Sequence, residues 1–290
     1  MTFTVLLILL IKTSLIALMI SLGLGLRLHK LAEHQQRPWL VVRVVLGSCV
    51  LVPLVGLVVL TLPLTQQLSP GARLGIALMA LSPSAPLTLR KAGVRGGDAH
   101  LAAVLQVAAA LVAVVSIPLL SAVFRTVFDV RGWDIQPGQV ALQVGGVQVL
   151  PLSVGLLLGH WRPDLGARWA APVQKVALLI TLVVVGLILC LVLPQLLTFA
   201  RANALAIAAM VVMTAAALGI GYGLGGGGGG ETRLTTALVT SMRNPGLALL
   251  FAVSHGTDVP GVKLAIVTYL LVTIVASIPF LRWAGRATAV

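Results

Sequence analysis

The sequence predicts an all-α integral membrane protein with about nine transmembrane helices, and its composition carries most of that prediction. Hydrophobic residues make up 59% of its 290 residues, charged residues only 9%, and the mean hydropathy is +1.08. A soluble domain usually carries about 25% charged residues, so a soluble enzyme is excluded. The formal charge of +13 accompanies no patch of basic and aromatic residues, so we expect membrane lipid around the chain and no nucleic-acid partner.

Nine apolar runs are long enough to cross a hydrocarbon core of about 30 Å, and polar or basic residues separate them. They cover residues 3–26, 39–62, 74–91, 99–124, 139–159, 173–194, 204–224, 234–254 and 263–281. The first run contains Lys12 and has neither a basic leader nor a small-residue cleavage site, so we interpret it as a span and not as a signal peptide. Too few residues remain for a soluble domain, so residues 1–290 are expected to form a single transmembrane domain.

Basic residues gather in alternate loops, and this predicts the orientation because Lys and Arg in short loops stay cytoplasmic. The odd-numbered loops and the C-terminus carry twelve: Arg27, Lys30, Arg37, Arg90, Lys91, Arg95, Arg162, Arg168, Lys175, Arg233, Arg282 and Arg286. The other loops carry five: Arg73, Arg125, Arg131, Arg201 and Lys263. We expect a multi-pass protein of the plasma (cytoplasmic) membrane, of bacterial inner-membrane type, with the N-terminus outside and the C-terminus in the cytoplasm.

The third and eighth spans contain residues that break a helix near its middle. Pro83 and Pro86 each remove a backbone donor from the third span, so we expect it to break near Ser84. Pro245 and Gly246 do the same in the eighth span. Interrupted helices at corresponding positions in two halves of a chain indicate a transporter site, although two ordinary proline kinks are the alternative.

The segments that follow the breaks strengthen this pairing. Each break is followed by a polar connection and one long apolar helix, which ends near Pro118 in the first half and near Pro279 in the second. The third span runs inwards and the eighth outwards by the same count of spans. The two halves are therefore predicted to form an inverted repeat.

Six consecutive glycines, Gly225–Gly230, form the seventh loop and are typical of a flexible linker. The alternative is a ligand-binding loop. A phosphate-binding P-loop is disfavoured because no Lys-Ser/Thr pair follows the glycines.

Arg243 lies at the second break, where a charge at membrane depth costs a few kcal/mol, so it needs a partner. All seven acidic residues lie in loops or at helix ends. Three interpretations remain open: Arg243 binds an anionic substrate through its planar fork, it neutralises the C-terminal end of a half helix and holds the crossing together, or it reaches a water-filled cavity. The first two are compatible.

Other polar side chains at membrane depth are candidates for a central cavity, or else glue between helices. The candidates are Ser48, Ser84, Thr88, Gln106, Thr240, Ser241 and Asn244. No Ser-His-Asp, His-Glu or paired-Asp constellation lies at that depth, so we expect no catalytic residues, no metal site and no cofactor.

Four segments together resemble the bile acid:sodium symporter family. They are LGLGLRLHKLAEHQQRPWLVVRVVLGSCVLVPLVG, PSAPLTLRKAGVRGGDAHLA, GIGYGLG and SMRNPGLAL, and they occur in the family's order. The resemblance implies a panel and a core, with two broken helices crossing in the core. It places the panel at about residues 3–26 and 139–194 and the core at about 39–124 and 204–281, in a form with nine helices.

The resemblance also implies that the family's sodium ligands are largely replaced. Thr88 and Leu89 stand where the family has a Ser-Asn pair, and Ala102 and Gln106 where it has hydroxyls. Val239 stands at the position of a glutamate, and Arg243 and Ser48 at the positions of glutamines. We interpret Arg243 as a stand-in for the bound cation.

These observations predict a secondary transporter that moves a small organic anion by alternating access, without sodium coupling through the family's usual sites. The alternative is a membrane-embedded receptor or enzyme that retains the fold without transport.

Overall fold

The computed structural model describes residues 3–26, 37–83, 96–128, 137–254 and 259–287. All regular elements within these ranges are helical. Six helical segments of the described chain are long and apolar enough to cross a membrane: Pro38–Thr61, Ala99–Phe128, Gly138–Trp161, Pro163–Leu187, Ala204–Leu224 and Val262–Ala284. Three shorter apolar helices are Lys12–Gly25, Pro70–Leu81 and Leu189–Ala202. The predicted all-α membrane class is confirmed.

The chain divides into two compact units. Unit 1 comprises Met1–Gln36 and Ala141–Pro194, and unit 2 comprises Arg37–Val140 and Gln195–Val290. These ranges are close to those expected for the panel and the core. The assignment of transport roles to the two units stays a prediction.

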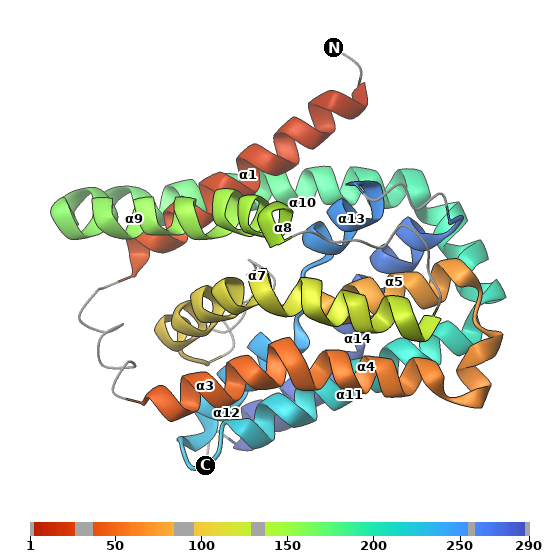
Figure 1. The fold of residues 1–290 in the computed structure, drawn as a ribbon. Coiled ribbons are helices and arrows are strands. Elements are labelled where there is room, and N and C mark those ends of the chain that lie inside the picture. Colours follow the sequence, from red (N-terminus) through yellow and green to blue (C-terminus); the bar gives the residue numbers. More distant parts are fainter. Residues whose placement is uncertain (1–2, 27–36, 84–95, 129–136, 255–258, 288–290) are drawn as a thin grey trace. The chain divides into compact units, whose positions relative to one another are not determined.

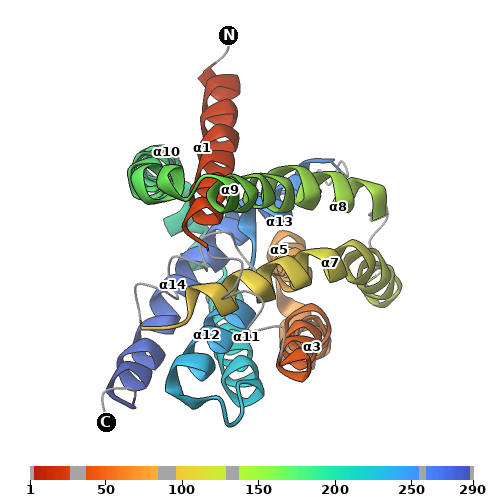
Figure 2. The same ribbon diagram turned by 90° about the vertical axis from the view of Figure 1, so that its left-hand side faces the viewer.

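In unit 1, α1 (Phe3–Gly25) packs along α9 (Leu150–Trp161), as Figures 1 and 2 show. Glycines allow this close approach: a Cβ on Gly155 would lie 2.1 Å from the carbonyl oxygen of Ile20, and one on Gly23 would lie 2.2 Å from that of Leu152. Small residues at spacings of four let membrane helices approach backbone to backbone. Upstream of α9, α8 (Pro137–Val144) continues into the π-helix η3 (Gly145–Val149).

Unit 2 begins with one continuous helical span that includes a π-helical turn: α3 (Pro38–Leu46), η1 (Gly47–Leu51) and α4 (Val52–Thr61). A short 3-10 turn, η2 (Pro63–Gln67), leads to α5 (Pro70–Leu81), whose first turn the Ser69 side chain caps by accepting from Ala72 N.

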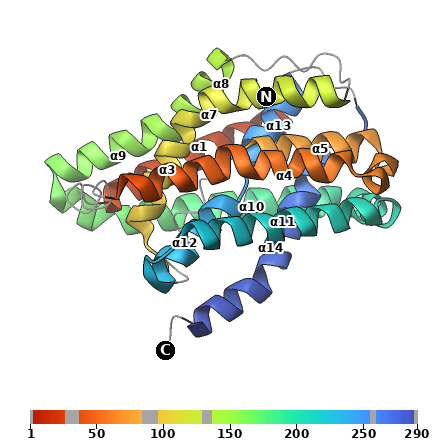
Figure 3. The same ribbon diagram turned by 60° about the horizontal axis from the view of Figure 1, so that its bottom comes forward.

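The rest of unit 2 consists of α7 (Ala99–Phe128), α11 (Ala204–Leu224), α12 (Gly229–Ser241), α13 (Pro245–Ser254) and α14 (Val262–Ala287). α11 packs against α12 and α14, and α14 packs against α5. Figure 3 shows α5 and α12 approaching the middle of this unit from opposite ends.

The sixth span differs most from its predicted bounds. Residues 173–194 lie inside α10 (Pro163–Ala202), a helix of 40 residues that contains Pro172 and Pro194. Hydropathy marks the part of a helix that suits the membrane, whereas helical geometry continues into polar flanks. The predicted start at residue 173 was therefore too late by ten residues.

A helix ends close to each of the two predicted breaks. α5 ends at Leu81, before Ser82 and Pro83, and α12 ends at Ser241, four residues before α13 begins at Pro245. Ser84, Pro86 and Thr88 lie outside the described residues.

The glycine run was predicted to be a flexible linker, and its flexibility stays a prediction. Gly225–Gly228 form a tight turn, and Gly229 and Gly230 are the first two residues of α12. Gly226 and Gly229 have φ angles of 55° and 81°, which a side chain would disfavour. Two arginines bind the turn: Arg43 Nη2 donates to Gly225 O at 3.3 Å, and Arg233 Nε donates to Gly226 O at 2.6 Å.

Candidate functional site at the crossing of the broken helices

The end of α5 and the start of α13 lie in direct contact in unit 2. The backbone N–H of Asn244 donates to the carbonyl of Ser82 at 3.0 Å. The same Asn244 begins α13, because its Oδ1 accepts from Leu247 N at 3.1 Å and its carbonyl accepts from Ala248 N at 3.1 Å. Asparagine before a proline is a favourable helix start, so the local sequence fixes where the second half helix begins.

Arg243 places its guanidinium at the C-terminal end of α5. The residue is 2% exposed. Its Nε donates to Met79 O at 3.1 Å, and its Nη2 donates to Ala80 O. The last carbonyls of a helix carry a partial negative charge, so a cation there is stabilised electrostatically as well as by its hydrogen bonds.

Pro83 explains why these carbonyls are available. A helical carbonyl bonds the N–H four residues later, and for Met79 that residue is Pro83, which has none. Met79 O therefore accepts from Ser82 N at 3.2 Å and from Arg243. The helix break supplies the acceptors that the buried cation needs.

The other side of the guanidinium contacts the π-helical turn η1. Nη1 donates to Ser48 O at 3.0 Å and to Ser48 Oγ at 3.2 Å, and it lies 3.4 Å from Thr240 O. The N–H of Val52 bonds Gly47 O, and the residue after it, Pro53, has no N–H. Neither residue offers a donor to Ser48 O, so this carbonyl accepts from Arg243.

No carboxylate of the described chain pairs with Arg243. Of the described acidic residues, Asp164 and Glu231 are exposed, and Asp98 caps a different helix. Arg243 is thus held by three carbonyl oxygens of two helix ends, one carbonyl of a π-turn and one hydroxyl. Its formal positive charge is not cancelled by a negative side chain there.

The structure brings together three of the residues predicted for the site: Ser48, Thr240 and Arg243. Gln106 is buried in α7, and the Ser241 hydroxyl bonds back to Leu238 O at 3.4 Å. The Thr240 hydroxyl is buried without a hydrogen-bond partner among the described residues.

Sequence reasoning missed the backbone acceptors Met79 and Ala80, because their side chains are apolar. The signal was present in the prolines: Pro83 lies four residues after Met79, and Pro53 lies five after Ser48.

Three main-chain oxygens at the crossing, Ser48 O, Met79 O and Ala80 O, accept hydrogen bonds from Arg243. Across the described ranges no group of three His, Cys, Asp or Glu side chains is placed to hold a metal.

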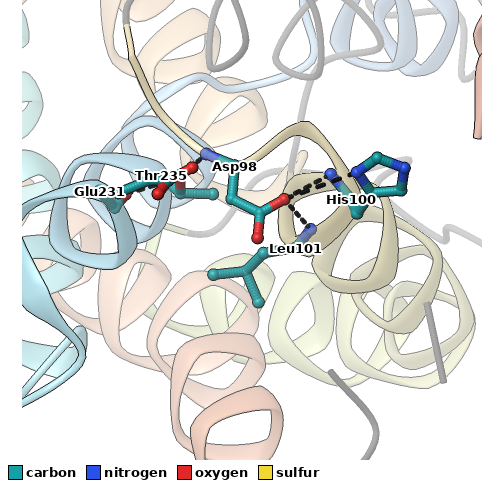
Figure 4. A network of polar contacts seen from close by, with 5 residues as sticks. All are labelled: Asp98, His100, Leu101, Glu231 and Thr235. Atoms are coloured by element: carbon teal, nitrogen blue, oxygen red, sulfur yellow. Dashed lines mark hydrogen bonds and ion pairs between the residues drawn. The ribbon is translucent and has the colours of Figure 1, made fainter. Parts of the chain in front are cut away.

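A second polar cluster joins α7 to α12 (Figure 4). The Asp98 carboxylate accepts from His100 N at 2.8 Å and Leu101 N at 3.0 Å, which caps the start of α7. The Asp98 N–H donates to Thr235 Oγ1 at 2.8 Å, and the Thr235 hydroxyl donates to Glu231 O at 2.8 Å. This cluster fixes the start of the long helix α7 against the first half of the second broken helix.

Comparison with known proteins adds one match. Residues 13–199, more than half of the chain, match the model of a family described as the Sodium Bile acid symporter family. A search of the curated proteins found no match.

Proposed function

Since this chain belongs to the sodium bile acid symporter family, a family of membrane transporters, we propose that it is a secondary transporter that moves a small organic anion by alternating access. We further propose that Arg243 takes the place of a coupling cation, so that transport does not depend on sodium bound at the family's usual sites.

The observation that carries this proposal is the hydrogen bonding of Arg243. One guanidinium donates to Met79 O, Ala80 O and both oxygens of Ser48. A bound metal ion would stabilise helix ends in the same way, by giving positive charge to their free carbonyls. The guanidinium does so permanently and without an ion from solution.

The same charge supports an anionic substrate. A buried cation without a carboxylate partner among the described residues produces a positive potential at the crossing, which favours an anionic substrate nearby. Because each guanidinium nitrogen already donates to protein oxygens, Arg243 attracts the substrate mainly through its field. We propose four uncharged side chains as further contacts of the substrate: Thr240, Ser241, Asn244 and Gln106. The Thr240 hydroxyl has no hydrogen-bond partner among the described residues.

Flux measurements in proteoliposomes test the proposal. Purified protein is reconstituted with a panel of carboxylates, sulfonates and steroid conjugates, in sodium and in potassium, with Arg243→Lys and Arg243→Gln alongside. We expect accumulation of at least one anion at equal rates in both salts, partial flux with lysine and none with glutamine. Flux that requires sodium would contradict the coupling proposal, and ligand binding without flux would indicate a receptor.

A further inference from the structure

A cavity lined in part by Arg233 lies at the glycine turn between α11 and α12. Figures 1 and 3 show the starts of α3 and α12 and the end of α14 on the same side of unit 2. The volume of the cavity is about 340 Å³. It is lined by the glycine turn, one arginine, one tyrosine and the end of α14: Gly226, Gly227, Gly229, Gly230, Arg233, Tyr222 and Ala284. It lies at the opposite end of α12 from the crossing and contains none of the residues that hold Arg243.

One arginine, Arg233, lines this cavity, and a second, Arg43, donates to the glycine turn beside it. Neither has an acidic partner among the described residues. Arg233 donates from Nε to Gly226 O, and its terminal nitrogens make no hydrogen bond to a described residue. The Arg43 guanidinium lies against the other side of Gly226, since a Cβ there would come within 2.7 Å of its Nη2. Glu231 follows the glycines, is exposed, and pairs with neither arginine. The turn therefore carries two positive charges with no carboxylate bonded to them in the described part of the chain.

The backbone of the turn adds donors. Gly228, which precedes α12, has no side chain and caps none of the N–H groups of the first turn. Gly229 and Gly230 line the cavity, so donors of this turn border it, and the missing side chains leave room for a ligand to approach.

Aromatic side chains typical of a membrane interface lie beside this cavity. Tyr222 contacts Phe280 and Trp283, with ring centroids 5.8 and 5.2 Å apart, and Arg233 lies over the Tyr222 ring at 5.3 Å. Trp283 is 53% exposed. Tyr and Trp gather at the level of the lipid headgroups, and basic pockets between membrane helices recognise anionic headgroups.

We propose that this cavity binds the phosphate group of an anionic phospholipid, with Arg43 and Arg233 as its charged donors and the glycine turn as its backbone cradle. Phosphate prefers planar guanidinium donors, which contact two of its oxygens at once. The acyl chains lie along the aromatic cluster of Tyr222, Phe280 and Trp283, in which Trp283 is exposed and the other two rings are half-buried. The lipid holds the connection between α11 and α12 and thereby the start of the second broken helix.

Lipid titration of the full-length protein tests this site. The protein is purified in detergent, and its melting temperature is measured as the concentration of one ligand is raised. The ligands are phosphatidylglycerol, phosphatidylcholine with the same acyl chains, and inorganic phosphate at millimolar concentration. We expect stabilisation by phosphatidylglycerol and not by phosphatidylcholine. We expect an apparent affinity about tenfold or more weaker in the double variant Arg43→Gln/Arg233→Gln, because charge-assisted hydrogen bonds are lost.

The controls separate this site from non-specific attraction. Arg282→Gln removes the same charge from an exposed position beside Trp283 and outside the cavity lining, and we expect it to bind like the wild type. Arg233→Lys keeps the charge without the fork and is expected to bind with intermediate affinity. Native mass spectrometry counts the retained lipid, so a variant with a lower melting temperature still reports its binding.

Several outcomes would overturn the proposal. They are equal stabilisation by both lipids, unchanged binding in the double variant, and an equal loss in Arg282→Gln. Inorganic phosphate that stabilises the protein as well as phosphatidylglycerol, at the same concentration, would show that the occupant is a soluble anion and not a lipid.

Discussion

Asn244, which lies between α12 and α13, donates its backbone N–H to the carbonyl of Ser82, which follows α5, so a hydrogen bond between main-chain atoms joins the second break to the end of α5. The side chain of Arg243, one residue earlier, donates hydrogen bonds to the last carbonyls of α5. Neither contact depends on a bound ion.

Removal of the Arg243 side chain is expected to destabilise the protein strongly. Arg243→Leu leaves the carbonyls of Met79, Ala80 and Ser48 buried without their donor, and breaking a buried charged network costs about 3–5 kcal/mol. The melting temperature in detergent checks this. Arg201→Leu, at an exposed end of α10, is the control and should change little. Equal effects of both variants would mean that Arg243 does not hold the crossing.

Sodium dependence is expected to appear when the residues that the family resemblance implies are restored. Val239→Glu/Arg243→Gln removes the permanent cation and adds a carboxylate one turn earlier on α12, in a buried position. We expect sodium, and not potassium, to raise the melting temperature of this double variant. Arg243→Gln alone should show less response, and a wild type that responds equally to sodium would contradict the replacement of the cation by Arg243.

The contact between α7 and α12 is expected to depend on the Thr235 hydroxyl. Thr235→Val keeps the shape but leaves the Asp98 N–H without its acceptor, at a cost of about 1–3 kcal/mol. Thr126→Val removes a hydroxyl that bonds only within α7, to Val123 O, and serves as the matched control. Thermal unfolding of both variants distinguishes the bond between helices from a general effect of threonine.

Asp98 is expected to act as the cap of α7. Asp98→Ala should cost about 0.5–2 kcal/mol, whereas Asp98→Asn, which retains an acceptor for His100 N and Leu101 N, should cost a few tenths. Equal losses in the two variants would indicate that the charge, and not the cap, is what matters.

Close packing of α1 on α9 is expected to tolerate no side chain at Gly155. Gly155→Ala would place a Cβ 2.1 Å from Ile20 O and should destabilise by about 1–3 kcal/mol through overpacking. Gly186→Ala, in α10 of the same unit, meets nothing within 4 Å and is expected to be neutral or slightly stabilising. If the two variants melt alike, α1 and α9 do not approach as closely as the structure shows.

Composition and hydropathy predicted the membrane class, and prolines predicted both breaks. These properties act locally, through single missing N–H groups and runs of apolar residues. The partners of Arg243 were not predicted, because main-chain carbonyls are present at every residue and only the folded chain decides which are free. The full length of α10 and the contacts of the glycine turn were not predicted, for a related reason. Hydropathy does not report helical geometry in polar flanks, and the two arginines that donate to the glycine carbonyls are far apart in sequence.

The second span makes two long-range contacts, one before the π-helical turn Gly47–Leu51 and one within it. Arg43, before this turn, donates to Gly225 O, and Ser48, within it, accepts from Arg243. One helical span therefore contacts two segments of the C-terminal third of the chain, and the number of residues between 43 and 48 fixes the spacing of the two contacts. Deletion of one residue between them would rotate one contact by about 100° relative to the other, since an α-helix has 3.6 residues per turn. A change in the length of this segment would therefore misplace one of the two contacts, and homologues that keep Arg43 and Arg243 should keep the spacing between residues 43 and 48.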